Sequence, residues 1–163
     1  MKKAVVGKAV PDMEVQATGG KNLRLRDLKG RFAVLYFYPK DNTPGCTLEG
    51  QDFRDQHDQF KKLKAVVYGI SRDSLASHEK FKAKFKFPFD LIADEDEKLC
   101  RLFDAIREKS LYGKKYMGVD RSTFILDQDG VLRREFRGVK VKGHVAEVIE
   151  EIRKLQSPAS KRQ

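Results

Sequence analysis

The amino-acid sequence predicts an α/β fold, with a central mixed β-sheet flanked by helices and an N-terminal hairpin, from three observations. Short apolar runs typical of buried strands alternate with longer segments in which apolar residues recur at helical spacing. Late in the chain, Asp127-Gln128-Asp129-Gly130 is a hairpin signal, and one more amphipathic segment follows it. Strands that alternate with helices are typical of a sheet covered by helices.

The predicted strands begin with an alternating pair. Residues 14–18 alternate, Gly19-Gly20 supply a turn and residues 23–25 alternate again, which indicates the N-terminal hairpin. Residues 33–38 and 65–70 are continuous apolar runs, as expected of strands buried on both faces. The remaining strand candidates are 90–93, 122–126 and 131–136.

Helical spacing predicts four helices between and after these strands. Their apolar stripes are, in chain order, Phe53, Phe60 and Leu63; residues 75–85; Leu99, Leu102, Phe103 and Ile106; and Val145, Val148, Ile149, Ile152 and Leu155, entered through Gly143. We expect residues 1–156 to form one domain and residues 157–163 to be a short, basic, flexible C-terminal tail.

The composition limits the class of protein. The chain has 163 residues, of which 40% are hydrophobic and 36% charged, a balance typical of a soluble globular domain. No apolar run approaches the roughly 20 residues that span a bilayer, and residues 4–6 are too short for a signal peptide. We therefore expect a cytoplasmic protein with no membrane partner. The net charge of +10 is interpreted as basic residues on solvated helix faces, so nucleic acid is not an expected partner.

The two cysteines, Cys46 and Cys100, form no Cys-x-x-Cys pair and are too few for a disulfide framework. The three histidines (His57, His78 and His144) share no metal-ligand spacing with them. No metal or cofactor site is therefore expected.

Cys46 lies where a buried strand gives way to a helix. Thr43 is a suitable N-cap and Pro44 suits the first helical position, so Cys46 falls in the first turn. Free backbone N–H groups and the helix dipole favour negative charge there, and the thiolate is the reactive form of cysteine. The residues alone leave two interpretations open, a reactive thiolate and a small buried side chain.

Several segments resemble the peroxiredoxin family. Pro39, Thr43 and Cys46 match its signature Pro-x-x-x-Thr/Ser-x-x-Cys. The wider sequence is similar to the Q-type subfamily, also called bacterioferritin comigratory proteins. The similar segments are Phe37-Tyr38-Pro39-Lys40-Asp41, residues 111–118 with 121–124, and residues 139–144. The resemblance covers nearly the whole chain, in order.

The resemblance implies a thioredoxin-like fold and a thiol-dependent peroxidase that needs no cofactor. Hydrogen peroxide and alkyl hydroperoxides would be reduced through a sulfenic acid at Cys46. Thr43 would hydrogen-bond the thiolate and the peroxide, Pro39 would cover the site, and Arg121 would be the cation beside the sulfur. Without the resemblance, Arg121 would be interpreted as a surface cation. Glu49 could orient an arginine, but it is also ordinary near a helix start and is not counted as a site residue.

The resemblance also raises the question of how Cys46 is recycled. Many Q-type members have a resolving cysteine five residues after the first, where this chain has Gln51. Cys100 lies at the edge of its helical stripe and is interpreted as a half-buried packing residue, with a resolving role as the minority hypothesis. We therefore favour a one-cysteine cycle completed by thioredoxin, glutaredoxin or a low-molecular-weight thiol, and expect a monomer.

The sequence leaves three alternative functions to consider. A thiol–disulfide oxidoreductase would share the fold, but its usual Cys-x-x-Cys is missing. A peroxide sensor that relays oxidation to a protein partner would use the same Cys46 chemistry. A nucleic-acid-associated protein would need a clustered basic face with interleaved aromatic residues. Because a preformed thiolate needs no histidine base, His57 and His144 are interpreted as structural.

Overall fold

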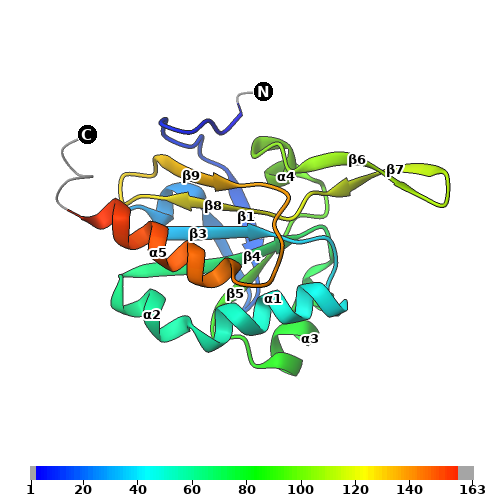
Figure 1. Cartoon of the computed structure of the whole chain (residues 1–163), viewed down its shortest axis with the longest axis horizontal. Coiled ribbons are helices and arrows are strands. Elements are labelled where there is room, and N and C mark those ends of the chain that lie inside the picture. The colour runs from blue at the N-terminus through cyan, green and yellow to red at the C-terminus, as the bar shows by residue number, and fades with distance from the viewer. Residues whose placement is uncertain (1–2, 158–163) are drawn as a thin grey trace.

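The structure, a computed structural model, describes residues 3–157 and has the predicted α/β architecture of a mixed sheet covered by helices (Figure 1). Except for Ser157, the predicted C-terminal tail lies outside the described residues. The extent of the domain, residues 1–156, stays a prediction. No helix among the described residues is long and apolar enough to cross a membrane.

The main sheet has seven strands in the order β2-β1-β5-β4-β3-β8-β9. β3, β4 and β5 are parallel, whereas β1, β2, β8 and β9 pair antiparallel to their neighbours, so the sheet is mixed. The strands are β1 (Glu14–Ala17), β2 (Lys21–Arg24), β3 (Phe32–Phe37), β4 (Ala65–Ser71), β5 (Asp90–Ala93), β8 (Ser122–Leu126) and β9 (Leu132–Phe136). β1 and β2 form the predicted N-terminal hairpin.

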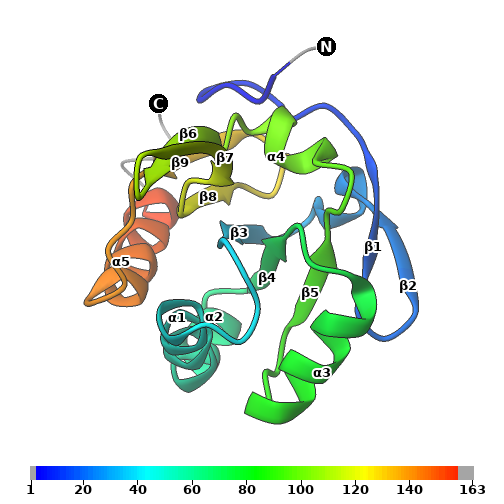
Figure 2. The ribbon, with the colours of Figure 1, turned by 90° about the vertical axis from the view of Figure 1, so that its right-hand side faces the viewer.

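The helices cover both faces of this sheet. α1, α2, α3 and α5 lie on one side, and α4 lies on the other (Figure 2). Their bounds are α1 (Pro44–Asp55), α2 (His57–Lys62), α3 (Leu75–Phe85), α4 (Lys98–Leu102) and α5 (His144–Gln156), and a 3-10 turn, η1, spans Leu25–Leu28.

The core has two layers, one on each face of the sheet, and the interior strand β3 contributes side chains to both. Successive side chains of a strand point to opposite faces. Val34 and Tyr36 accordingly join a cluster with Cys46 and the apolar residues of α1, α2 and α5. Leu35 and Phe37 join a second cluster, which contains α4. All six residues of β3 are buried, which explains the continuous apolar run in the sequence.

Two of the predicted helices are wrong in extent. The segment with Phe53 and Phe60 is two helices, because the chain breaks at Gln56, where φ is −100° and ψ is 9°. Both phenylalanines are nevertheless fully buried. The helix predicted through Ile106 ends at Leu102, because Asp104 adopts a left-handed φ of 54° and turns the chain away.

A separate two-stranded hairpin, β6 (Ile106–Leu111) and β7 (Lys114–Val119), was not predicted. Most of its residues are exposed, so it carries no apolar alternation. It projects from the body of the molecule at the end where α1 begins (Figure 1).

Candidate active site

The loop after β3 places Cys46 in the first turn of α1. Thr43 has the extended backbone of an N-cap, with φ −92° and ψ 156°, and Pro44 is the first helical residue, as predicted. Cys46 is the third residue of the helix and only 2% exposed. Its backbone N–H therefore belongs to the first turn, where amides have no acceptor within the helix and the dipole favours negative charge.

Arg121 reaches the sulfur of Cys46 from the sheet. It directly precedes β8, whose first residue, Ser122, pairs with Phe37 at the end of β3. This register brings the arginine to the point where the chain leaves β3 for the Cys46 loop. Its Nη2 donates a hydrogen bond to Cys46 Sγ over 3.3 Å, and its side chain is 17% exposed. Arg121 is therefore not a solvated surface cation.

Glu49 holds the other side of the guanidinium. Arg121 Nη1 donates to Glu49 Oε1 at 2.6 Å, and the glutamate side chain has no exposed surface. Burial raises the pKa of Glu49 to about 7, although the neighbouring Arg121 opposes the shift. Its second oxygen, Oε2, has no hydrogen-bond partner among the described residues.

Glu49 was not predicted as a site residue, and one signal could have found it. Cys46 and Glu49 are three residues apart in a helix, so they share a face. A carboxyl group on that face is placed to bind the same arginine as the sulfur. Gly45 leaves room for the guanidinium, because a Cβ at this position would lie only 3.3 Å from Arg121 Nη2.

Thr43 and Pro39 lie in the loop that leads to Cys46, and both are half-buried. The Thr43 hydroxyl donates to the carbonyl of Lys40 at 2.8 Å and makes no capping bond to α1. A hydroxyl that donates one bond keeps its acceptor lone pairs. Thr43 therefore retains the capacity to accept a hydrogen bond from a molecule bound at this loop.

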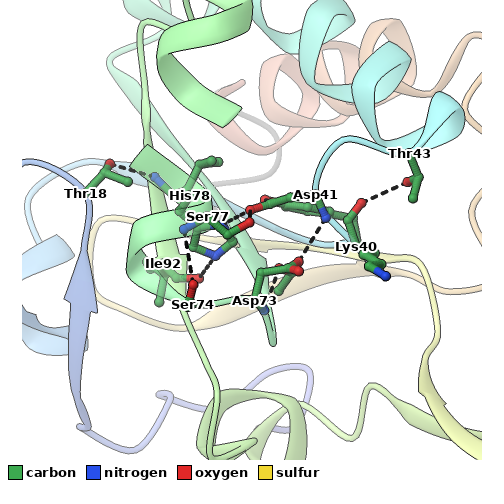
Figure 3. A network of polar contacts seen from close by, with 12 residues as sticks. Thr18, Lys40, Asp41, Thr43, Asp73, Ser74, Ser77, His78 and Ile92 are labelled. Carbon is green, nitrogen blue, oxygen red and sulfur yellow. Dashed lines mark hydrogen bonds and ion pairs between the residues drawn. The ribbon is translucent and has the colours of Figure 1, made fainter. Parts of the chain in front are cut away.

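A buried polar network fixes the same loop to α3 (Figure 3). Asp41 Oδ1 accepts from the Tyr38 hydroxyl at 2.6 Å, and Oδ2 accepts from Ser77 at 2.8 Å and lies 2.7 Å from His78 Nδ1. The backbone N–H of Asp41 donates to Asp73 at 2.9 Å. The loop is thus held by α3 and by the segment between β4 and α3, although no sequence pattern indicated this.

The same network holds the imidazole ring of His78. Its Nε2 lies 3.0 Å from the carbonyl oxygen of Ile92, which can only accept, so Nε2 carries a hydrogen. The imidazole is fully buried, and we assign it a role in holding Asp41.

The other two histidines, His144 and His57, were interpreted as structural and lie near the core layer that contains Cys46. His144 Nε2 is 2.7 Å from the Thr123 hydroxyl, and burial together with Arg121 lowers the pKa of His144 to about 4. The imidazole is therefore neutral at physiological pH. The His57 ring is half-buried, with its centroid 6.4 Å from that of Phe89.

Cys100 lies across the sheet from Cys46. Cys46 belongs to the core layer of Val34 and Tyr36, whereas Cys100 belongs to that of Leu35 and Phe37. The prediction of a half-buried side chain at a stripe edge is wrong, because Cys100 is wholly buried. Burial raises its pKa, and the nearby Asp94 carboxylate raises it further. Both effects disfavour a reactive thiolate.

No group of three or more His, Cys, Asp or Glu residues within residues 3–157 is placed to hold a metal ion. The Cys46 sulfur contacts the Arg121 guanidinium, and the loop that contains Thr43 leads to it. A buried cysteine sulfur that accepts a hydrogen bond from a guanidinium is a candidate nucleophile for a small electrophile.

Comparison with known proteins identifies the family. The AhpC/TSA family model matches residues 6–135. Peroxiredoxin Bcp of Bacillus subtilis is 48% identical over 150 residues, which cover 92% of this chain and 96% of that protein. The chain is a Q-type (Bcp) peroxiredoxin of the AhpC/TSA family. As a peroxiredoxin it is a thiol-dependent peroxidase, as the sequence resemblance implied.

Solved peroxiredoxin structures share the fold. Peroxiredoxin Q of Xanthomonas campestris is 46% identical, with a TM-score of 0.84 over 87% of this chain and 90% of that one. A PrxQ mutant of Xylella fastidiosa is 37% identical, with a TM-score of 0.90 over 96% and 100%. The prediction of a thioredoxin-like α/β fold is confirmed.

Proposed function

We propose that Cys46 is the peroxidatic residue and that this peroxiredoxin reduces hydrogen peroxide and alkyl hydroperoxides. The observation that carries the proposal is the 3.3 Å hydrogen bond from Arg121 to Cys46 Sγ at the start of α1. A related bacterioferritin comigratory protein from Xanthomonas campestris has been studied for alkyl peroxide reduction.

The first step is attack of the Cys46 thiolate on the terminal oxygen of the hydroperoxide. A sulfur–oxygen bond forms and the oxygen–oxygen bond breaks, so the sulfur becomes a sulfenic acid. The electron pair leaves with the alkoxide, or with hydroxide from hydrogen peroxide, and the leaving oxygen takes a proton from water. Sulfur is oxidised and the peroxide is reduced.

The surrounding residues act on this step through charge and position. Arg121 carries a fixed positive charge and several donors, so it stabilises both the thiolate and the charge that develops on the departing oxygen. Glu49, which accepts from Arg121 at 2.6 Å, orients the guanidinium. Thr43 accepts from the hydroperoxide O–H and aligns it for in-line displacement. Pro39, which has no N–H, limits the access of water to the sulfur.

The return step uses an external thiol. Gln51 is not a thiol, and Cys100 is buried on the opposite face of the sheet. We infer a one-cysteine cycle in which thioredoxin, glutaredoxin or a low-molecular-weight thiol attacks the sulfenic acid. A disulfide bond forms, the sulfur–oxygen bond breaks and water leaves; a second thiol then releases Cys46. We also infer a monomer that acts in the cytoplasm.

The chain's two cysteines give a matched test. Peroxide consumption with dithiothreitol as donor is measured for Cys46→Ser and for Cys100→Ser. We expect the first variant to lose activity while its circular dichroism stays unchanged, and the second to keep most of it. Substantial thiol-dependent turnover by folded Cys46→Ser would overturn the assignment of the nucleophile.

A further inference from the structure

Most of the large exposed apolar side chains of this protein lie in the β6–β7 hairpin and in α1, the helix that contains Cys46. Among the described residues, seven large apolar side chains are exposed, and four of them belong to the β6–β7 hairpin. A fifth, Leu48, lies in α1 two residues after Cys46. The hairpin projects from the same end of the sheet as the start of α1 (Figure 1 and Figure 2). The four exposed apolar residues of the hairpin are Leu111, Tyr112, Tyr116 and Met117.

The base of the hairpin is fixed beside the active site. Only Asp120 separates β7 from Arg121, the residue that contacts the Cys46 sulfur. Arg72, which directly follows β4, donates to the carbonyl of Met117 at 3.2 Å. Val119 at the end of β7 is fully buried. The tip of the hairpin therefore extends into solvent, while its base is held next to Arg121.

The residue at the tip has no explanation in the fold. Tyr112 is 96% exposed and adopts a left-handed φ of 52°, and Gly113 follows with φ 77°. Two-residue turns with positive φ at both positions favour Asn-Gly or Asp-Gly, because a bulky side chain is strained there. A strained aromatic residue that buries nothing within its own chain points to a role outside it.

The register of the hairpin defines the surface beside this tyrosine. Leu111 pairs with Lys114, and Lys109 pairs with Tyr116, so these four side chains project from one side of the ribbon. The close approach of Lys109 and Tyr116 atoms to the Cβ position of Gly118 agrees with this. Lys109 donates to the carbonyl of Val119 at 2.6 Å within the hairpin. We therefore define the hairpin face as Leu111, Lys114 and Tyr116 together with Tyr112 at the tip.

Charge defines the partner that the hairpin face fits. Residues 106–119 contain four cations, Arg107, Lys109, Lys114 and Lys115, against one acidic residue, Glu108. The whole chain carries +10, so two copies of it repel each other, whereas an acidic protein is attracted. Tyrosine is enriched among residues that dominate binding at interfaces.

We propose that the hairpin face docks a protein dithiol reductant whose surface around its thiols is acidic and partly apolar. This inference rests on the proposed thiol-dependent cycle. In the docked complex one thiol of the partner attacks the Cys46 sulfenic acid, so that a mixed disulfide forms and water leaves. The second thiol of the partner then attacks its own sulfur in that disulfide, releasing the Cys46 thiolate and the oxidised partner.

The test separates docking from chemistry by the choice of reductant. Peroxide turnover is measured with an acidic thioredoxin, kept reduced by its reductase and NADPH, and in parallel with dithiothreitol. The central variant is Tyr112→Asn, because asparagine suits the left-handed turn and preserves the hairpin. Val6→Ser is the control, since Val6 is also an exposed apolar residue but lies in the N-terminal segment.

We expect Tyr112→Asn to lower kcat/KM for thioredoxin by about tenfold or more while leaving turnover with dithiothreitol unchanged. The double variant Tyr112→Asn/Lys114→Glu should fall further and lose part of the salt dependence. Val6→Ser should behave as the unchanged protein with both donors.

Three results would overturn the proposal. The first is an unchanged kcat/KM for thioredoxin in Tyr112→Asn and in the double variant. The second is turnover with dithiothreitol but with neither thioredoxin nor glutaredoxin. The third is a concentration-dependent dimer, seen by sedimentation, that Tyr112→Asn dissociates, because a second copy would then occupy the hairpin face. Absence of turnover with every donor would instead refute the proposed peroxidase cycle.

Discussion

Replacing Arg121 with methionine removes two contacts, one with the Cys46 sulfur and one with the buried Glu49 carboxyl group. Loss of a charged donor at the reacting sulfur should slow peroxide reduction by at least about tenfold, which corresponds to about 1.4 kcal/mol of transition-state stabilisation. Loss of the cation also leaves Glu49 buried without its partner. Breaking a buried ion pair typically destabilises a fold by about 3 kcal/mol.

The stability effect depends on pH in a definite direction. The pKa of Glu49 is already raised from 4.5 to about 7 by burial, and Arg121 is the group that restrains it. In Arg121→Met the pKa rises further, so the carboxyl group stays protonated over a wider range. The free energy of unfolding should therefore fall most at alkaline pH, where the unpaired carboxylate must ionise within the core.

A second substitution distinguishes catalysis from structure. Glu49→Gln in the Arg121→Met background removes the buried charge, so it should restore most of the lost stability. It should not restore the rate, because the donor to sulfur is still missing. The assays are stopped-flow peroxide consumption under single-turnover conditions and urea unfolding of the same samples. If the double variant regains both the rate and the stability, Arg121 serves only to neutralise Glu49 and the electrostatic reasoning fails.

Three further predictions concern the loop and the carboxyl groups. Thr43→Val should slow the attack on peroxide by about tenfold, measured as the single-turnover rate, with no comparable fall in the urea midpoint. Asp41→Asn weakens the hydrogen bonds to Tyr38, Ser77 and His78. It should lower the free energy of unfolding by about 2 kcal/mol and slow the attack on peroxide. Equal stability of the variant and the unchanged protein would exclude the network as an anchor of the loop. Relative to Glu49→Gln, the unchanged protein should lose about 3 kcal/mol of its free energy of unfolding between about pH 4.5 and pH 7. The reason is that a carboxyl group whose pKa is raised in the folded state stabilises the fold below its unfolded pKa, and this contribution is lost as the pH rises through the folded pKa. Parallel pH profiles of the two proteins would contradict the shift.

The buried elements of the fold could be predicted from sequence because burial leaves a pattern. β3 and β4 appeared as apolar runs, β5 as a short strand candidate, and α3 and α5 as helical stripes, since each packs against the core. The β6–β7 hairpin leaves no such pattern because most of its side chains are exposed. The break at Gln56 was missed for a related reason: Phe53 and Phe60 stay buried on both sides of it.

The candidate site shows a second limit, which is distance along the chain. Thr43, Pro44 and Cys46 are neighbours, so local capping rules predicted their arrangement. Arg121 lies 75 residues from Cys46, and it reaches the sulfur only through the pairing of β8 with β3. Family resemblance, not spacing, indicated Arg121. Its partner Glu49 shares a helix face with Cys46, and this spacing gains its meaning once the arginine is placed.

The central claim is that the Cys46 sulfur takes an oxygen atom from the peroxide and holds it until an external thiol arrives. Mass spectrometry of the peptides after one equivalent of hydrogen peroxide, with dimedone present to trap sulfenic acid, tests this most directly. We predict a dimedone adduct on the Cys46 peptide in near-stoichiometric yield, with Cys100 unmodified. Consumption of the peroxide with Cys46 still in its reduced, unmodified form would contradict the account.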